Sequence, residues 1–380
     1  MSLTSIPAQS DHIKRSGTTL PIASQQPGSL NNINTNSIQN LFERLLSEKD
    51  VLLTDGATGT NLFEMGLQSG DAPEFWNIEQ PEKISAHYRS FIDAGSDIIL
   101  TNTFGGTRYR LKLHKAEERV DELNTAAVQL LKNEIAKVDR DIIIAGSIGP
   151  TGEILAPLGE MQPEGAIAAF AEQASALKEA GAHVLWIETM SSREEVELAV
   201  EGCRKTGLPI VVTLSFDTNG KTMMGVGAAD LMSLNQQVNP KLHACGTNCG
   251  VGASEVVAAV RNMKTADADS NTHIIAKANC GVPKFVDGKI RYTGTPEIMA
   301  TYAVMVRDAG AKIIGGCCGT TAIHVAAMRK ALDTIPRGEA PSFEQIGELL
   351  GEISKGAVAE SRGEAAPQPR NSGRRRRRTH

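Results

Sequence analysis

The sequence has few aromatic residues, few cysteines and no long apolar run, and each shortage excludes a class of protein. Aromatic side chains make up 4% of the 380 residues, and six positions are cysteine. Six cysteines in a chain of this length are too few for a disulfide scaffold, and we expect the protein in a reducing, cytoplasmic compartment. A cluster among these cysteines would therefore indicate a metal or catalytic site. No apolar run reaches the ~18 to 20 residues of a transmembrane helix, and the start of the chain lacks the basic-then-apolar pattern of a secretory signal. We therefore expect no membrane association.

The two ends of the chain lack the composition of a folded domain. Residues 1–38 are rich in Ser, Asn, Gln and Pro and contain no aromatic residue, so we expect a disordered N-terminal arm. Residues 361–380 hold seven arginines and a single acid, Glu364, which makes the rest of the chain more acidic than the net charge of −5 indicates. We expect residues 359–380 to form a disordered, solvated tail. No aromatic residues are interleaved with the arginines, so the sequence predicts no nucleic-acid partner, with a polyanion contact as the alternative.

The segment from residue 39 to residue 335 repeats one pattern. Short β-rich apolar runs begin at residues 51, 97, 141, 183, 209, 243, 273 and 311, and each ends in a polar or glycine-rich cluster. Each interval is long enough for one crossover helix. Three of the joints read Asp-Ala-Gly or Glu-Ala-Gly, which predicts left-handed helix caps at Gly95, Gly181 and Gly310. Eight such units predict a (β/α)8 TIM barrel, and a doubly wound parallel sheet is the alternative.

Residues 336–358 follow the predicted barrel as a C-terminal helical extension. Phe343, Ile346, Leu349, Leu350 and Ile353 have the spacing of one amphipathic helix. Such a helix could pack on its own barrel or bind a second subunit, so the sequence leaves a homo-oligomer open.

In a TIM barrel the chemistry lies at the carboxyl ends of the strands, and here those ends gather cysteines. Cys249 ends the sixth run, Cys280 the seventh, and Cys317 and Cys318 the eighth. Thiolates at Cys249, Cys317 and Cys318 would suit a catalytic Zn²⁺ that keeps an open fourth position. The alternative is that small buried cysteines fill space near the barrel mouth.

Other residues near these ends have plainer expected roles. Cys203 falls on a predicted helix and Cys245 within a strand, so both are expected to pack in the interior. We expect Cys280 to be a spectator thiol, although it could occupy the fourth zinc position. Lys277 could form an imine with a carbonyl substrate, but pairing with a nearby carboxylate is the expectation. The turn at Gly315–Thr320 could hold phosphate, as in phosphate-binding aldolases and isomerases, but thiolates would repel it.

Six short motifs stand at the strand ends, and together they resemble one protein family. They are Asp55–Thr60, Thr101–Phe104, Gly149–Pro150, Glu188–Thr189, Asn248–Cys249 and Gly315–Thr320. This set resembles the zinc-dependent homocysteine S-methyltransferases, and the resemblance runs from about Leu41 to Asp333. Within that family, the segments Thr222–Gly225 and Asn248–Ala253 are most similar to the bacterial betaine-homocysteine S-methyltransferases.

The resemblance implies zinc chemistry at the three cysteines. It makes Cys249, Cys317 and Cys318 the ligands of Zn²⁺ and the sulfur of homocysteine the fourth ligand. A free thiol has a pKa near 8.5, whereas coordination to zinc removes its proton at neutral pH. Three thiolates leave the metal site negatively charged, so the bound sulfur stays nucleophilic and needs no general base. The expected reaction is methyl transfer to homocysteine, which gives methionine.

The resemblance also implies how homocysteine is bound. Glu188, helped by Asp55, is expected to receive the ammonium group. The glycine-rich turns after the first and third strands offer backbone N–H groups for the carboxylate, which makes Gly56, Thr58 and Ser147 further substrate-binding candidates.

The methyl donor is the point at which the sequence departs from the animal betaine enzymes. Those enzymes carry a tyrosine directly after the motifs that end here in Phe104 and Glu188, and aromatic faces are the usual receptors of quaternary ammonium groups. Here the two positions hold Gly105 and Thr189. Trp76 is similar to a tryptophan of those enzymes and is the candidate cation-binding residue. Possible replacements for the tyrosines are Phe75, Phe104 and Tyr109.

The sequence therefore predicts betaine or a similar onium compound as donor. Related enzymes take the methyl group from S-methylmethionine, or from methylcobalamin when folate and cobalamin domains follow the barrel. The residues after about 335 leave no room for such domains, so this alternative needs a separate cobalamin protein as partner in a split methionine synthase. A non-enzymatic zinc-buffering or thiol-sensing barrel is a third alternative.

Overall fold

The computed structural model describes residues 40–216, 219–267, 271–286 and 289–364. The chain divides into two compact units, Met1–Gln39 and Asn40–His380, and all the described residues belong to the second. The predicted N-terminal arm and most of the predicted arginine-rich tail lie outside the described residues. Among the described residues, no helix is long and apolar enough to cross a membrane.

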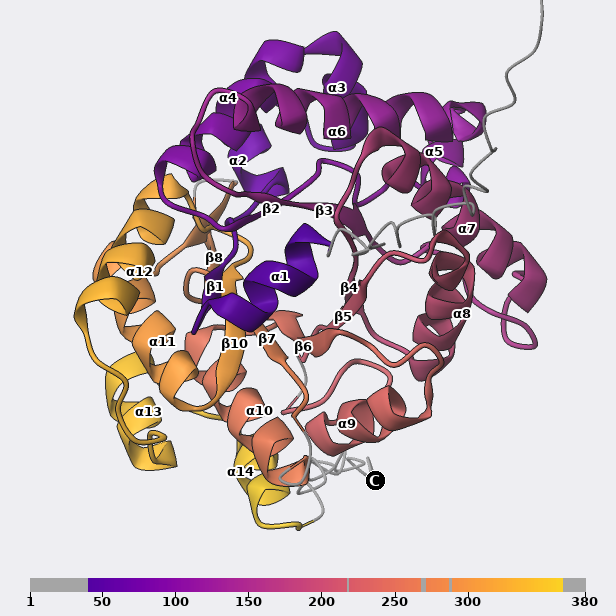
Figure 1. Cartoon of the computed structure of the whole chain (residues 1–380). Coiled ribbons are helices and arrows are strands. Elements are labelled where there is room, and N and C mark those ends of the chain that lie inside the picture. The colour runs from indigo at the N-terminus through magenta and orange to yellow at the C-terminus, as the bar shows by residue number, and fades with distance from the viewer. Residues whose placement is uncertain (1–39, 217–218, 268–270, 287–288, 365–380) are drawn as a thin grey trace, which may run out of the picture. The chain divides into compact units, whose positions relative to one another are not determined.

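Eight parallel strands form the barrel of the second unit (Figure 1). They are β1 (Leu52–Leu53), β2 (Ile98–Leu100), β3 (Ile143–Ile148), β4 (Val184–Met190), β5 (Ile210–Leu214), β6 (Ala244–Cys249), β7 (Ile274–Ala278) and β10 (Ala311–Gly316). Their order in the sheet is β1-β10-β7-β6-β5-β4-β3-β2. A bridge between Thr54 and Ile98 brings the two end strands of that order together. The predicted (β/α)8 barrel is confirmed.

The strands are buried on both faces, which explains why each reads as a continuous apolar run. Alternate side chains of all eight strands fill the interior of the barrel, with Trp186 of β4 as the largest. The intervening side chains point outward and pack against the surrounding helices. Helix α1 (Leu41–Glu48) adds Phe42, Leu45 and Leu46 to the inner layer, so it closes the amino-terminal mouth of the barrel.

The main outer helices alternate with the strands along the chain. They are α4 (Pro81–Asp93), α6 (Val120–Ile135), α7 (Pro163–Ala180), α8 (Arg193–Cys203), α9 (Ala228–Gln237), α10 (Ala253–Ala266), α11 (Pro296–Asp308) and α12 (Ala322–Thr334). Gly95, Gly181 and Gly310 follow three of these helices with φ values of 94°, 109° and 113°. Because side chains are strained in that region, glycine is required at these caps, and the three predicted left-handed caps are confirmed.

Several connections on the carboxyl side of the barrel carry structure that the sequence did not indicate. The β1–β2 connection contains α2 (Gly59–Glu64), the short 3-10 helix η1 (Pro73–Phe75) and α3 (Trp76–Glu79). After β2 come α5 (Arg108–Lys112) and the 3-10 helix η2 (Glu117–Arg119). After β7 an antiparallel hairpin forms from β8 (Pro283–Val286) and β9 (Lys289–Tyr292). These connections surround the face on which the chemistry of a TIM barrel is found. A further 3-10 helix, η3 (Arg204–Thr206), lies on the opposite, amino-terminal side, between α8 and β5.

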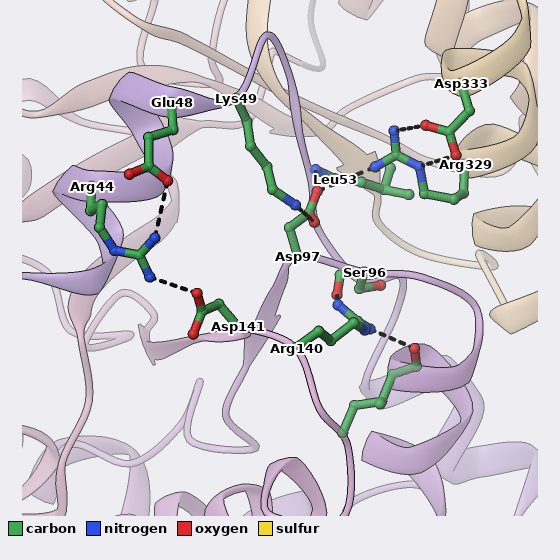
Figure 2. Close-up of polar contacts among 11 residues, drawn as sticks. Arg44, Glu48, Lys49, Leu53, Ser96, Asp97, Arg140, Asp141, Arg329 and Asp333 are labelled. Atoms are coloured by element: carbon green, nitrogen blue, oxygen red, sulfur yellow. Dashed lines mark hydrogen bonds and ion pairs between the residues drawn. The ribbon is translucent and has the colours of Figure 1, made fainter.

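A network of ion pairs holds α1 on the amino-terminal face (Figure 2). At its centre is the buried carboxylate of Asp97, which accepts three hydrogen bonds. Its donors are the backbone N–H of Leu53 (2.9 Å), the ammonium of Lys49 (2.5 Å) and the guanidinium of Arg329 (3.3 Å). On α1 itself, Arg44 pairs with Asp141 at 2.6 Å. These contacts supplement the apolar packing of α1. They lie on the face opposite the carboxyl ends of the strands, where the cysteines stand.

The C-terminal extension differs from the single helix that the spacing predicted. It forms α13 (Phe343–Leu350) and α14 (Lys355–Ser361), with a break at Gly351, whose φ is 104°. Ile346 is fully buried against the barrel, and the carboxylate of Glu360 accepts a hydrogen bond of 2.9 Å from the backbone N–H of Ala228, at the start of α9. The extension therefore packs on its own barrel.

Candidate active site

A cavity of about 680 Å³ opens at the carboxyl ends of the strands. Its walls come from the connections after β1 and β2 and from the ends of β3, β4, β6, β7 and β10. Residues that line it include Thr58, Ser147, Glu188, Cys249 and Cys317. Pockets of this size are typical of sites for small molecules.

Three cysteine sulfurs form a cluster in this cavity. The Sγ atoms of Cys249, Cys317 and Cys318 all lie within 4.8 Å of one another, and Cys249 and Cys318 are 3.9 Å apart. The backbone is bent to achieve this, because Cys249 has a φ of 62° and Gly319, directly after the vicinal pair, a φ of 77°. At position 319 even a Cβ would be 2.3 Å from the ring of Tyr292, so only glycine fits.

The three clustered cysteines differ in the pKa of their thiols. Hydrogen bonds from the neighbouring sulfurs of Cys317 and Cys318 lower the pKa of Cys249 to about 3. The same contacts with the Cys249 thiolate raise the pKa of Cys317 to about 11 and raise that of Cys318 as well. The three sulfurs thus share protons around one thiolate. A divalent cation among them would stabilise all three as thiolates.

The chemistry of the cluster fits a metal ion. Three soft sulfurs that can converge on one point, with room left for a fourth ligand, suit a four-coordinate ion such as Zn²⁺. Asn279 lies beside the cluster: its side-chain nitrogen donates to the carbonyl of Gly250 at 2.7 Å, and its side chain also hydrogen-bonds Cys249 and lowers the pKa of that thiol.

Glu188 and Ser147 present a carboxylate and a hydroxyl to the same cavity. The Ser147 hydroxyl donates to Glu188 Oε1 at 2.6 Å, and Glu188 is 8% exposed. Burial raises the pKa of Glu188 to about 7, against the opposing effect of the Lys277 ammonium. A buried carboxylate with this pKa gains its charge readily when a cationic group is bound beside it.

Asn248 ties the Glu188 segment to the cysteine cluster. Its side-chain oxygen accepts the backbone N–H of Thr189 at 2.9 Å, and its nitrogen donates to the Thr189 hydroxyl at 2.7 Å. The same nitrogen lies 3.8 Å from the sulfur of Cys317. These contacts hold Thr189 at a φ of 62°, a backbone conformation that is costly for a threonine. The carboxylate and the sulfurs are therefore fixed relative to each other.

Three comparisons with known proteins bear on this site. A family model described as homocysteine S-methyltransferase matches residues 52–332, which cover most of the chain. The chain belongs to the homocysteine S-methyltransferase family. The family resemblance that the six motifs predicted is confirmed.

Individual relatives agree with this assignment. The methionine synthase of Mycobacterium tuberculosis is 27% identical over 313 residues, and that of Mycobacterium leprae is 26% identical over 310 residues. These alignments cover 78% and 76% of this chain, but the chain spans only about a quarter of the length of either relative (26% and 25%). The solved homocysteine methyltransferase MmuM of Escherichia coli matches with a TM-score of 0.65 and 24% identity, covering 77% of this chain and 99% of MmuM. This last similarity supports the fold.

The structure brings most of the predicted site residues of this family member into the cavity. Gly56, Thr58, Ser147 and Glu188 line it together with the three clustered cysteines. Asp55 does not line it. One of its oxygens pairs with Lys277 at 3.1 Å and the other accepts the Leu100 N–H at 2.8 Å. Without substrate, Asp55 holds Lys277, and its expected help in receiving an ammonium stays a prediction.

Trp76 also lies outside the lining of the cavity. Its ring is 8% exposed and belongs to the apolar core, and the ammonium of Lys83 lies 4.3 Å from the ring centroid. The ammonium of a protein side chain thus lies against this ring, and the part of Trp76 in binding a donor cation stays a prediction. Of the three suggested replacements, Phe104 lines the cavity, whereas Phe75 and Tyr109 pack against apolar clusters outside its lining.

The remaining cysteines and the lysine behave as predicted. Cys203 and Cys245 are fully buried in the apolar core. Cys280 is buried too and stands outside the three-sulfur cluster, and a Cβ at Gly294 would lie 2.8 Å from its sulfur. Lys277 is paired with a carboxylate, and the charges of Asp55 and Glu188 outweigh its burial and raise its pKa. An ammonium that keeps its proton is a poor imine-forming nucleophile.

The sequence did not single out several polar residues of this site. Glu74 and Arg110 line the cavity, as does His114, and they stand on the connections after β1 and β2. Asn279 approaches Cys249, and the phenol of Tyr292 interacts with Cys318. None of them carries a local signal of function, since each stands in a connection after a strand, and the periodicity does not specify the course of these connections.

Proposed function

We propose that this chain transfers a methyl group from a small onium donor, betaine in the first place, to the thiol of homocysteine, with Zn²⁺ held by Cys249, Cys317 and Cys318. The observation that carries the proposal is the three-sulfur cluster in one cavity with a buried carboxylate, Glu188. Zn²⁺ bound to the three sulfurs would remove the proton of the substrate thiol and keep its sulfur nucleophilic.

Residues of the chain orient the acceptor. Glu188 is the anionic group for the homocysteine ammonium, and the Ser147 hydroxyl holds its carboxylate in place. Lys277, kept protonated by Asp55, adds a positive charge in the cavity that favours both the thiolates and the substrate carboxylate. Gly56 and Thr58 line the same region and bring backbone close to the substrate. These groups bind and orient, and none is required as a general base.

Two other donors remain candidates. S-methylmethionine is one of them because related enzymes of the family that the sequence resembles use it. MmuM, by its title a homocysteine methyltransferase, has been solved in a metallated form, which supports a metal here. The methionine synthases are about four times longer than the matched segment, so the chain corresponds to a part of such an enzyme. The second candidate function is therefore the homocysteine-binding subunit of a split methionine synthase, with a separate cobalamin protein as its partner.

A donor panel tests the proposal. Purified zinc-loaded protein is incubated with homocysteine and, separately, with betaine, S-methylmethionine or methylcobalamin, and methionine is measured. Methionine formed from betaine supports the first function, and methionine formed only from methylcobalamin would replace it with the second. The Cys249→Ser variant serves as control and should form none, because a neutral hydroxyl is a much poorer zinc ligand than a thiolate.

A further inference from the structure

The cavity contains a second group of polar side chains that the binding of homocysteine does not use. Glu74 stands on η1, in the β1–β2 connection, and Arg110 and His114 stand on or directly after α5. All three line the cavity, together with the aromatic side chains of Phe63 and Phe104. This outer group combines one carboxylate, one guanidinium, one imidazole and the rings of two phenylalanines.

Arg110 forms no close ion pair. Among the described residues, no carboxylate lies within 4.0 Å of its guanidinium, and that group donates no hydrogen bond. Burial raises the pKa of the Glu74 carboxyl, and the charge of Arg110 acts on that carboxyl from farther away and lowers its pKa by a smaller amount. Arg108, two residues earlier on the same helix, shows the contrast, since it pairs with Glu172 at 2.6 Å on the outer surface. Arg110 is half-buried, and a Cβ at Gly152 would lie 3.0 Å from its Nη1 atom, so the group rests against the β3–α7 connection. A held, half-buried and unpaired guanidinium is suited to bind a carboxylate.

Glu74 supplies the opposite charge. It is 3% exposed, and its Oε1 atom accepts the backbone N–H of Gly105 at 2.6 Å. A Cβ at position 105 would lie 3.0 Å from the same oxygen, so a larger residue at this position would crowd the carboxylate. The side chain also lines the cavity. The place at which the animal betaine enzymes carry a tyrosine is thus occupied here by a glycine beside a carboxylate.

Phe104, which precedes Gly105 in the chain, adds an aromatic surface to the same cavity. Its side chain is 36% exposed although it belongs to the cavity lining. The ring packs so closely on Gly149 that a Cβ there would lie 2.6 Å from Cε2, which fixes the ring in place. Aromatic rings and carboxylates both attract onium groups, so the pair of Glu74 and Phe104 can act as a receptor for a quaternary cation.

We propose that Glu74, Phe104 and Arg110 form the methyl-donor subsite and that this subsite selects a zwitterionic donor, an onium ion that also carries a carboxylate. Glu74 and Phe104 receive the onium charge, and Arg110 binds the carboxylate. The inference rests on the proposed function and narrows its donor to this class. The new S–C bond forms as the methyl–onium bond breaks, and the bonding pair stays on the donor heteroatom, which becomes neutral. The donor carboxylate is unchanged by the reaction and serves only for recognition.

Arg110→Gln is the first test, and it uses the full zinc-loaded chain with homocysteine bound. Betaine carries both charges, whereas tetramethylammonium carries the onium charge alone. Arg110→Gln should weaken betaine binding on the order of 10- to 100-fold, the usual effect of losing one charge-assisted contact, and should leave the binding of tetramethylammonium and of homocysteine unchanged. Arg108→Gln is the matched control from the same helix and should change none of these. An unchanged betaine affinity in Arg110→Gln would overturn the inference.

Glu74→Gln is the second test and separates the two charges. It should weaken the binding of betaine and of tetramethylammonium alike, because both need the carboxylate for the onium. Equal loss for both ligands supports the assignment, and no loss for either contradicts it. If Glu74→Gln fails to fold, Arg110→Gln still decides, since its guanidinium makes no hydrogen bond that folding would lose.

Binding, measured by calorimetry, distinguishes the failure of this inference from the failure of the proposed function. Betaine that binds in an Arg110-dependent manner without being converted supports the donor subsite and contradicts the proposed betaine reaction. Wild-type protein that binds neither betaine nor S-methylmethionine, yet forms methionine from methylcobalamin, overturns the donor subsite and leaves homocysteine methylation intact.

Discussion

Replacing Glu188 by glutamine tests how the acceptor is recognised. The substitution keeps the size of the side chain and its ability to accept the Ser147 hydroxyl, which now lies 2.6 Å from Oε1, but removes the charge. Hydrogen bonds to charged groups contribute roughly 1.5 to 3 kcal/mol, which corresponds to a loss of about 10- to 150-fold in affinity. Because Glu188 is 8% exposed, solvent screening should not reduce this effect greatly.

The pH dependence gives the same substitution a second readout. Burial raises the pKa of Glu188 to about 7, so the side chain is largely protonated below that pH and largely charged above it. Only the charged form attracts an ammonium. The affinity for an amino-acid ligand should therefore rise as the pH increases through about 7, and Glu188→Gln should abolish this rise. Methionine is the better ligand for this profile, because it has the ammonium but no thiol whose own ionisation would add to the slope.

The assay is calorimetric titration of methionine into zinc-loaded protein between pH 5.5 and 8.5, with zinc content measured in parallel. Glu194→Gln, an exposed position in the first turn of α8, is the matched control and should behave as the wild type. Unchanged affinity in Glu188→Gln would remove this residue from the substrate pocket. Loss of zinc in the same variant would show that its role is structural instead.

Three further predictions concern the ion pairs of Asp97, the C-terminal extension and the proposed zinc ligands. Asp97→Asn should lower the free energy of unfolding, measured by urea denaturation, by roughly 2 to 4 kcal/mol, because it removes a buried charge that has two cationic partners. The control, Asp333→Asn on the exposed side of the same ion-pair network, should lower it by less than about 1 kcal/mol. Glu360→Ala should cost roughly 1 to 2 kcal/mol in the same assay, since it leaves backbone N–H groups at the start of α9 without their acceptor. Cys249→Ser should lose zinc by elemental analysis while Cys245→Ser, at a buried position outside the cluster, retains about one zinc per chain.

The barrel was predictable because its signals are local and repeated. Buried parallel strands require continuous apolar runs, and the left-handed caps require glycine at Gly95, Gly181 and Gly310, so both leave a direct trace in the sequence. The cysteine cluster was predictable for a related reason. Strand ends in a closed barrel meet on one face, so Cys249, Cys317 and Cys318 had to come near one another once the fold was known.

Features that depend on tertiary context were not predictable. Asp55 pairs with Lys277 on β7 at 3.1 Å. The ammonium of Lys83 on α4 lies 4.3 Å from the ring centroid of Trp76. In both cases the cationic neighbour comes from a distant part of the chain and left no local signal, and the expected binding roles of Asp55 and Trp76 stay predictions.

The course of the backbone in the long connections and in the C-terminal extension could not be predicted either. The spacing of apolar residues from Phe343 to Ile353 continues across Gly351, so periodicity alone predicted one helix. The left-handed backbone at that glycine ends α13, and α14 begins only at Lys355, after the cap residue Ser354. Glu74 and Arg110 were not predicted as site residues for the same reason. Only the fold of their connections brings these two polar residues to the cavity.

Binding of homocysteine to the zinc-loaded and the metal-free protein tests the central claim most directly, by calorimetry in two buffers of different ionisation enthalpy. Metal bound by Cys249, Cys317 and Cys318 would take up the substrate sulfur as a thiolate, so binding to the zinc-loaded protein should release about one proton per homocysteine. Metal-free protein should bind homocysteine much more weakly and release none. Equal affinity of the two forms, with no proton released by either, would contradict the account.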